Sequence, residues 1–202
     1  MSTLLRTCIA TLIVAATAAS TSVFAANGSK SSVSRACPAK MDRWDTEPCQ
    51  IDIPDRTFYG VRTGYSGGNP VYDRLYYWNH HNVYADYRRI PLFVPGGKLS
   101  QNVVLPRLDA MSSLPTLELK FVMDAARNAR GTLKATIYTV DSTGRETPVH
   151  EQDFAPSYSE HKVLVPFVDF PPPNARIAFT WNAEPDGGDI SVSNIRLIQH
   201  RR

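Results

Sequence analysis

The feature that most constrains the fold is an alternation of apolar and polar residues that recurs along the chain from Lys98 onward. Apolar side chains take every second position, and most of the residues between them are charged or bear a hydroxyl. A pattern with period two is typical of β-strands that bury one face. The alternating segments are 117–123, 133–137, 163–167, 177–181 and 190–192.

Residues that favour turns separate these segments. Residues 141–144 (DSTG) predict a turn, and the prolines at 171–173 predict a loop because proline cannot donate to a β-ladder. Several strands without a long helical period predict an all-β domain, an antiparallel β-sandwich in which each sheet buries one face. We expect Ile177, Phe179 and Ile190 to line its core.

The closing segment of the chain, residues 175–198, resembles the C-terminal hairpin of galactose-binding-like jelly rolls. The similarity lies in a strand (175–181, ARIAFTW), a turn (185–189, PDGGD) and a final strand (190–197, ISVSNIRL). Ser193 stands where that family commonly has Asp. The resemblance covers this segment only and implies a jelly-roll-like sandwich, a fold whose members often bind carbohydrate. It carries no ligand residue to this chain.

Residues 1–25 predict a secretory signal peptide. Arg6 gives a positive start, an uncharged apolar run extends from Cys8 to Ser20, and residues 23–25 (VFA) place small side chains at the cleavage site. We therefore expect a mature chain that begins at Ala26 and is secreted or periplasmic, with a signal peptide of bacterial type. An uncleaved membrane anchor is the alternative, but a bilayer-spanning helix needs about 20 apolar residues.

The mature chain is predicted to hold a flexible leader, residues 26–36, and a single β-sandwich domain, residues 37–202. Two cysteines remain after cleavage, Cys37 and Cys49. In an oxidising compartment such a pair predicts a disulfide. Metal-ligating thiolates are the alternative, but neither a CxxC spacing nor a nearby histidine supports them.

An irregular, aromatic-rich segment, residues 58–93, precedes the sandwich strands and holds half of the chain's Phe, Trp and Tyr residues. If residues 72–78 are extended, the even-numbered side chains share one face, and Leu75 and Tyr77 share the other. Arginine is a poor core residue, so the face that carries Arg74 is expected to point outward. The candidate ligand-binding residues are Tyr72, Arg74, Tyr76, Trp78 and His80.

Such a row of rings is compatible with three roles. Sugars stack their C–H faces on Tyr and Trp, and Arg, Asn and His donate hydrogen bonds to their hydroxyls. Aromatic residues are also frequent in protein–protein interfaces. Finally, the rings can simply fill the core of the sandwich. We expect an exported, non-catalytic protein that recognises a glycan or cell-surface polymer. The alternatives are an envelope structural or assembly accessory protein that binds another protein, and a secreted hydrolase.

No catalytic residue can be assigned from the sequence, because no carboxylate pair stands in a context that nominates it and no cysteine of the mature chain is expected to be free. A metal site could in principle use His80 and His81, with Asp86 as a third ligand. Adjacent residues on a strand point to opposite faces, so His80 and His81 are not expected to bind one metal ion. No cofactor is expected either, with calcium at the 185–189 turn as the alternative. A net charge of +3 with scattered basic residues argues against nucleic acid, and the mature chain is not expected to span a membrane.

Overall fold

The computed structural model describes residues 35–85, 90–109 and 113–201, so the predicted signal peptide and residues 26–34 of the predicted leader lie outside the described residues. Within these ranges the chain forms strands and no helix, and the predicted all-β class is confirmed. None of the described residues therefore belongs to a helix that could span a bilayer. The strands are β1 (Lys40–Met41), β2 (Cys49–Ile51), β3 (Val61–Ser66), β4 (Asn69–Asp73), β5 (Asn79–Ala85), β6 (Pro91–Val104), β7 (Arg107–Leu108), β8 (Pro115–Ala125), β9 (Gly131–Val140), β10 (Glu146–Phe154), β11 (Tyr158–Pro166), β12 (Asn174–Ala183) and β13 (Ile190–Arg201).

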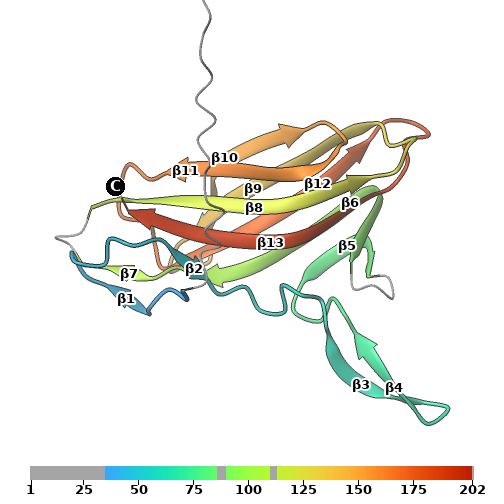
Figure 1. Cartoon of the computed structure of the whole chain (residues 1–202), viewed down its shortest axis with the longest axis horizontal. Coiled ribbons are helices and arrows are strands. Elements are labelled where there is room, and N and C mark those ends of the chain that lie inside the picture. The colour runs from blue at the N-terminus through green and yellow to red at the C-terminus, as the bar shows by residue number, and fades with distance from the viewer. Residues whose placement is uncertain (1–34, 86–89, 110–112, 202) are drawn as a thin grey trace, which may run out of the picture. The chain divides into compact units, whose positions relative to one another are not determined.

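The strands form an antiparallel β-sandwich, as the sequence predicts (Figure 1). One layer has the order β10-β9-β12-β6, with β5 paired to the far side of β6. The other has the order β11-β8-β13, with β2 paired to the end of β13. Two short pairs lie outside these layers, β1 with β7 and β3 with β4.

Strand β6 takes part in both layers. Its first residues pair with β13, where Phe93 faces Ile190, and its last residues pair with β12, where Lys98 faces Thr180. The change occurs at Gly96 and Gly97. A Cβ atom on Gly97 would lie 2.8 Å from the Asn82 carbonyl oxygen, so the two backbones can approach this closely only at glycine. Strand β5 pairs with β6 on both sides of the bend, with His81 opposite Lys98 and Val83 opposite Phe93.

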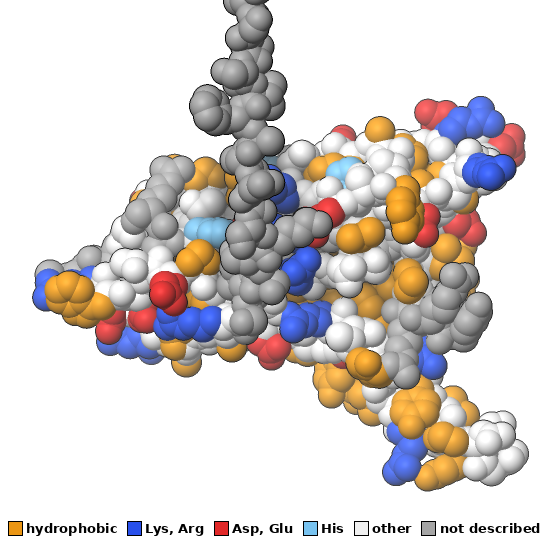
Figure 2. All heavy atoms as spheres, in the orientation of Figure 1, with side chains coloured by type: hydrophobic (Ala, Val, Ile, Leu, Met, Phe, Trp, Pro, Cys, Tyr) orange, Lys and Arg blue, Asp and Glu red, His pale blue; other side chains and the backbone are white. Residues whose placement is uncertain are grey.

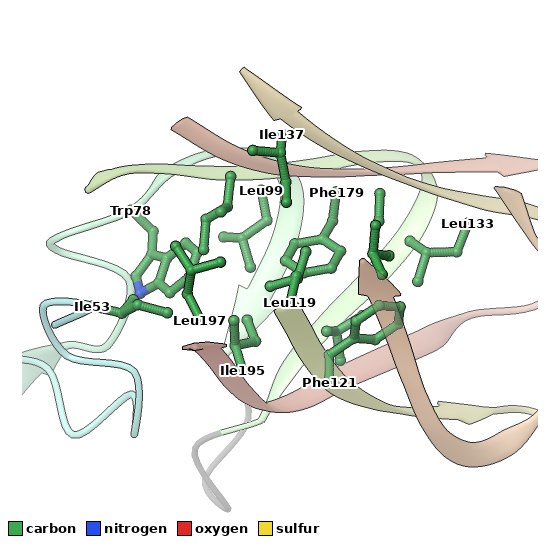
Figure 3. Close-up of a cluster of buried hydrophobic side chains, with 14 of the residues drawn as sticks. Ile53, Trp78, Leu99, Leu119, Phe121, Leu133, Ile137, Phe179, Ile195 and Leu197 are labelled. Atoms are coloured by element: carbon green, nitrogen blue, oxygen red, sulfur yellow. The ribbon is translucent and has the colours of Figure 1, made fainter. Parts of the chain in front are cut away.

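The core lies between the layers and is built from the alternating apolar positions (Figure 3). Ile177, Phe179 and Ile190 are each 0% exposed, so their predicted place in the core is confirmed. The ring of Phe121 on β8 packs edge-on against that of Phe179 on β12, with centroids 5.1 Å apart. This contact joins strands of opposite layers, and both rings point into the core as the alternating pattern predicts.

The predicted disulfide between Cys37 and Cys49 is present, with the two Cα atoms 4.8 Å apart. It holds the N-terminal segment beside β2. The Gln50 amide donates to the Arg35 carbonyl at 2.8 Å, and the Cys37 amide donates to the Gln50 carbonyl at 2.9 Å. The last residues of the predicted leader, Arg35 and Ala36, are therefore bonded into the domain.

Candidate ligand-binding groove

The extended segment expected over residues 72–78 does not form. Strand β4 ends at Asp73, whose Oδ1 accepts a hydrogen bond from the Leu75 amide at 3.0 Å. The Trp78 amide then donates to the Leu75 carbonyl at 2.8 Å and closes a turn ahead of β5. Aspartate favours such a turn because its side chain bonds the backbone two residues further on. The even-numbered residues consequently do not share one strand face.

The turn reverses the expected orientation of two rings. Trp78 is 4% exposed and belongs to the core, so its predicted place on an outward face is wrong. Tyr77, expected to point inward, is 50% exposed, whereas Leu75 is buried as expected. The physical reason is the loss of alternation: a turn can place neighbouring side chains on the same side, which a strand cannot.

A buried amide fastens this turn to the sandwich. Gln101, on β6, is 3% exposed, and its Nε2 donates to the Pro54 carbonyl at 2.8 Å and to the Tyr77 carbonyl at 3.0 Å. One side chain thus bonds the loop before β3 and the turn before β5. The surface tyrosines on these segments are therefore held by a fixed scaffold.

Exposed tyrosines gather around the turn. Figure 2 shows hydrophobic side chains over the β3–β4 hairpin at the lower right, with Lys or Arg side chains among them. Contiguous exposed apolar surface of this kind is typical of interaction sites. Six tyrosines in this region are 48–65% exposed: Tyr59, Tyr65, Tyr72, Tyr76, Tyr77 and Tyr84.

Three of the predicted ligand-binding residues lie in one hollow. Tyr72 from β4, Arg74 from the turn and His80 from β5 line a space of about 280 Å³, together with Tyr84. The structure does not bring the other two predicted residues there. Tyr76 is 57% exposed but is not part of the lining, and Trp78 is buried.

A second hollow, of about 440 Å³, lies over the outer face of the first layer. Strands β5, β6, β12 and β9 contribute to it side by side. His80 lines this hollow as well as the first, so the two hollows share this residue. We call the two together the His80 groove. The polar residues that line the second hollow are Asn79, His80, His81, Lys98, Ser100, Tyr138, Arg176 and Thr180.

Cross-strand pairing explains how distant residues meet in the second hollow. Arg176 lies opposite Tyr138 in the register of β12 and β9, and its guanidinium carbon is 4.4 Å from the centroid of the Tyr138 ring. An ion pair of 2.5 Å with Glu146 holds the same guanidinium from β10. The guanidinium is thereby held by neighbours on two strands, the Tyr138 ring on β9 and the Glu146 carboxylate on β10.

Sequence reasoning missed several residues of the groove. Tyr138, Arg176 and Lys98 occupy outward positions of alternating strands, where polar residues are expected whether or not they bind anything. Only the strand register brings them together, and the sequence contains no signal for it. Tyr84 belongs to the aromatic segment and could have been included on composition alone.

The described residues contain no group of three or more His, Cys, Asp or Glu side chains able to hold a metal ion. The 185–189 turn is formed by backbone bonds, in which the Gly187 amide donates to the Glu184 carbonyl and the Gly188 amide to the Asn128 carbonyl. Its glycines are packed closely, since a Cβ on Gly187 would lie 2.5 Å from the Arg130 carbonyl oxygen. These contacts account for the turn as a connection between β12 and β13.

No protein-family model matches the chain, and no curated protein matches it. Among solved structures, the chain is similar to a CBM4 domain (14% identity, TM-score 0.42), covering 61% of this chain and 94% of that one. It is also similar to the CBM22-1 xylan-binding domain of Paenibacillus barcinonensis Xyn10C (10% identity, TM-score 0.41), covering 62% of this chain and 86% of that one.

A third similar structure is the enzymatically active domain of tailspike protein 4 of bacteriophage CBA120, at 15% identity and a TM-score of 0.39. That match covers 59% of this chain and only 17% of the tailspike chain. Several of the solved structures found are carbohydrate-binding modules.

Proposed function

We propose that this chain is an exported, non-catalytic protein that binds a glycan in the His80 groove. The observation that carries the proposal is that His80 lines two hollows, one with Tyr72 and Tyr84 and the other with Tyr138 and Arg176. A glycan offers C–H faces and hydroxyls along an extended chain. The groove offers aromatic rings for the faces and Arg and His donors for the hydroxyls.

The described lining of the groove supports binding rather than hydrolysis. Glycoside hydrolysis uses a pair of carboxylates placed roughly 5–10 Å apart. The described lining holds a single carboxylate, Asp73, and that carboxylate accepts the hydrogen bond from the Leu75 amide that begins the turn. Asp73 is thus engaged in shaping the hollow.

Export is supported by the Cys37–Cys49 disulfide, a bond that persists in oxidising compartments. Together with the signal-like residues 1–25, it favours a chain that folds outside the cytoplasm. The intact mass of the protein recovered from the medium or periplasm tests this. A mass that begins at Ala26 supports export with cleavage, and a mass that retains Met1 contradicts it.

Glycan binding is tested by screening the exported protein on a glycan array and measuring the best polymer by titration. Removing one ring at the edge of the groove, Tyr84→Ala or Tyr72→Ala, should weaken binding about tenfold, because each stacked ring contributes on the order of 1–1.5 kcal/mol. Both tyrosines are exposed, so the melting temperature should stay nearly unchanged.

The matched control is Tyr158→Ala. Tyr158 is 81% exposed on β11 and lies outside the groove, so its loss should leave affinity unchanged. Equal affinity of the Tyr72, Tyr84 and Tyr158 variants would contradict a site at the groove. Absence of binding to every glycan would contradict the function itself.

Protein binding is the second candidate, and the β3–β4 hairpin favours it. Every residue of β4 is exposed, and the hairpin pairs with no other described strand. Tyr65 stands on this hairpin at 65% exposure, with the Arg62 guanidinium donating to its hydroxyl at 2.8 Å. A pull-down that depends on Tyr65 but not on Tyr84 would favour this function over glycan binding.

A further inference from the structure

We infer that the polymer bound in the His80 groove is anionic, a polyuronate whose carboxylates contact Lys98 and His81. This inference deepens the proposed function and rests on it. It is carried by the charges of the second hollow and by the way in which the sheet places them.

The described lining of the second hollow is one-sided in charge. Its residues include Lys98, Arg176, His80 and His81, and none of them is Asp or Glu. The Glu146 carboxylate that pairs with Arg176 belongs to β10 and is not among the lining residues. A ligand carboxylate would therefore meet the Lys98 ammonium and no lining carboxylate that repels it.

Strand register places two of these donors face to face. His81 on β5 lies directly opposite Lys98 on β6, and Lys98 lies opposite Thr180 on β12. Side chains at directly opposed positions stand on the same face about 5 Å apart. A carboxylate bound between them would accept a charge-assisted hydrogen bond from the Lys98 ammonium and a hydrogen bond from a ring N–H of His81.

The neighbouring cations on this face are already neutralised, and Lys98 is not. The Nζ atom of Lys134 lies 3.5 Å from a Glu151 carboxylate oxygen, and Arg176 is paired with Glu146. Lys98 is exposed, and no carboxylate in the described part of the chain lies within ion-pair distance of its Nζ. Among the described residues, Lys98 is therefore a cation of the hollow that no carboxylate neutralises, and it is available to a bound polymer.

The test compares polymers that differ only in charge. Polygalacturonate and polymannuronate are each titrated beside the same polymer after full methyl esterification, which removes the charge and keeps the backbone. We expect each free acid to bind at least about tenfold more tightly than its ester. The ratio of the affinity for the acid to the affinity for its ester should fall as NaCl rises from about 0.1 M to about 1 M, because the Debye length shrinks from about 10 Å to about 3 Å.

The variant is Lys98→Gln, and its control is Lys162→Gln, an exposed lysine on β11 outside the groove. Lys98→Gln should reduce affinity for the free acid about tenfold and leave the ester unaffected, and Lys162→Gln should change neither. Equal binding of acid and ester, or tighter binding of neutral polymers, would overturn the inference while the proposed function stands. If no polymer binds, the proposed function fails, and the inference fails with it.

Discussion

The indole of Trp78 is stacked on the ring of Phe58, with centroids 5.3 Å apart and an interplanar angle of 29°. Both rings are buried, although both belong to the aromatic-rich segment that precedes the sandwich strands. Phe58 precedes β3 and Trp78 follows β4, so their contact ties both ends of the β3–β4 hairpin to the core. The aromatic segment therefore divides into buried rings that anchor it and exposed tyrosines that the anchor holds at the surface.

This stack predicts that Trp78→Ala destabilises the fold. Truncation of a large buried aromatic side chain removes apolar contacts and leaves a cavity, which typically costs about 3–5 kcal/mol. Urea unfolding followed by tryptophan fluorescence of the remaining indoles, or by far-UV circular dichroism, measures the change. The exposed neighbour Tyr76 is the control, and Tyr76→Ala should stay within about 0.5 kcal/mol of the unsubstituted chain. Equal stability of the two variants would contradict the burial of Trp78.

The sandwich could be predicted because large apolar residues recur at every second position of its strands. In 117–123 and 177–181, all odd-numbered residues are apolar and buried, so core membership follows from the pattern alone. The Cys37–Cys49 pair was equally accessible, since few alternatives exist for two cysteines in an exported chain. Neither inference needs to know which strand lies beside which.

The groove could be predicted only in part. Composition points to Tyr72, Arg74 and His80, and these three residues do line one hollow. The strand expected over residues 72–78, however, is interrupted by a turn at Asp73. The Asp73 side chain favours a turn by bonding the backbone, whereas the spacing of apolar residues is equally compatible with a strand. The apolar pattern therefore cannot distinguish the two. The pairing of Arg176 with Tyr138 depends on long-range register, which no local pattern encodes.

Loss of the disulfide should lower stability. The bridge closes a loop with a sequence separation of 12, and cross-linking a loop of that size contributes about 3 kcal/mol in the chain-entropy model. The full effect is expected here because Cys49 is 0% exposed on β2, so the loop is anchored on the domain. The double variant Cys37→Ser, Cys49→Ser and the reduced unsubstituted chain should therefore share one lowered melting temperature. A reduced protein that melts like the oxidised one would contradict this.

His161 should make stability depend on pH. Burial lowers the pKa of His161 below its ordinary value of 6.5. The rings of Phe121 and Phe154 lie 5.4 and 4.8 Å from the imidazole, and the Ser157 and Ser159 hydroxyls lie 2.7 and 3.1 Å from its Nε2. As the pH falls below about 6.5, the unfolded chain takes up this proton before the folded chain does, so stability decreases.

The measurement is the urea midpoint between about pH 7 and about pH 5.5, a window in which histidines titrate and most carboxylates do not. His161→Asn removes the imidazole, so the midpoint of this variant should fall less steeply with pH than that of the unsubstituted chain. The comparison isolates His161 because all other histidines are present in both proteins. Parallel slopes would show that the folded chain accepts the proton as readily as the unfolded one.

The last prediction concerns the glycine that lets the hairpin approach the turn. Gly60 has a φ of +78°, and a Cβ atom there would lie 2.4 Å from the Asp73 carbonyl oxygen and 2.7 Å from the Arg74 Cα. Alanine at this position would be strained in its backbone and would push Asp73 and Arg74 away, at a cost of about 1–3 kcal/mol. Gly64 on β3 is the matched control, since a Cβ atom there would meet no described atom within 4 Å and its φ is not positive.

Amide hydrogen exchange distinguishes the two substitutions. In Gly60→Ala, the amides of β3 and β4 should exchange faster and the melting temperature should fall, because the hairpin loses its close contact with the turn. In Gly64→Ala, exchange and melting should remain near those of the unsubstituted chain. Since Asp73 and Arg74 line the hollow that His80 shares, Gly60→Ala should also weaken glycan binding while Gly64→Ala does not. Unchanged exchange in Gly60→Ala would mean that the hairpin does not depend on this contact, and the hollow beside it would then be shaped by β5 alone.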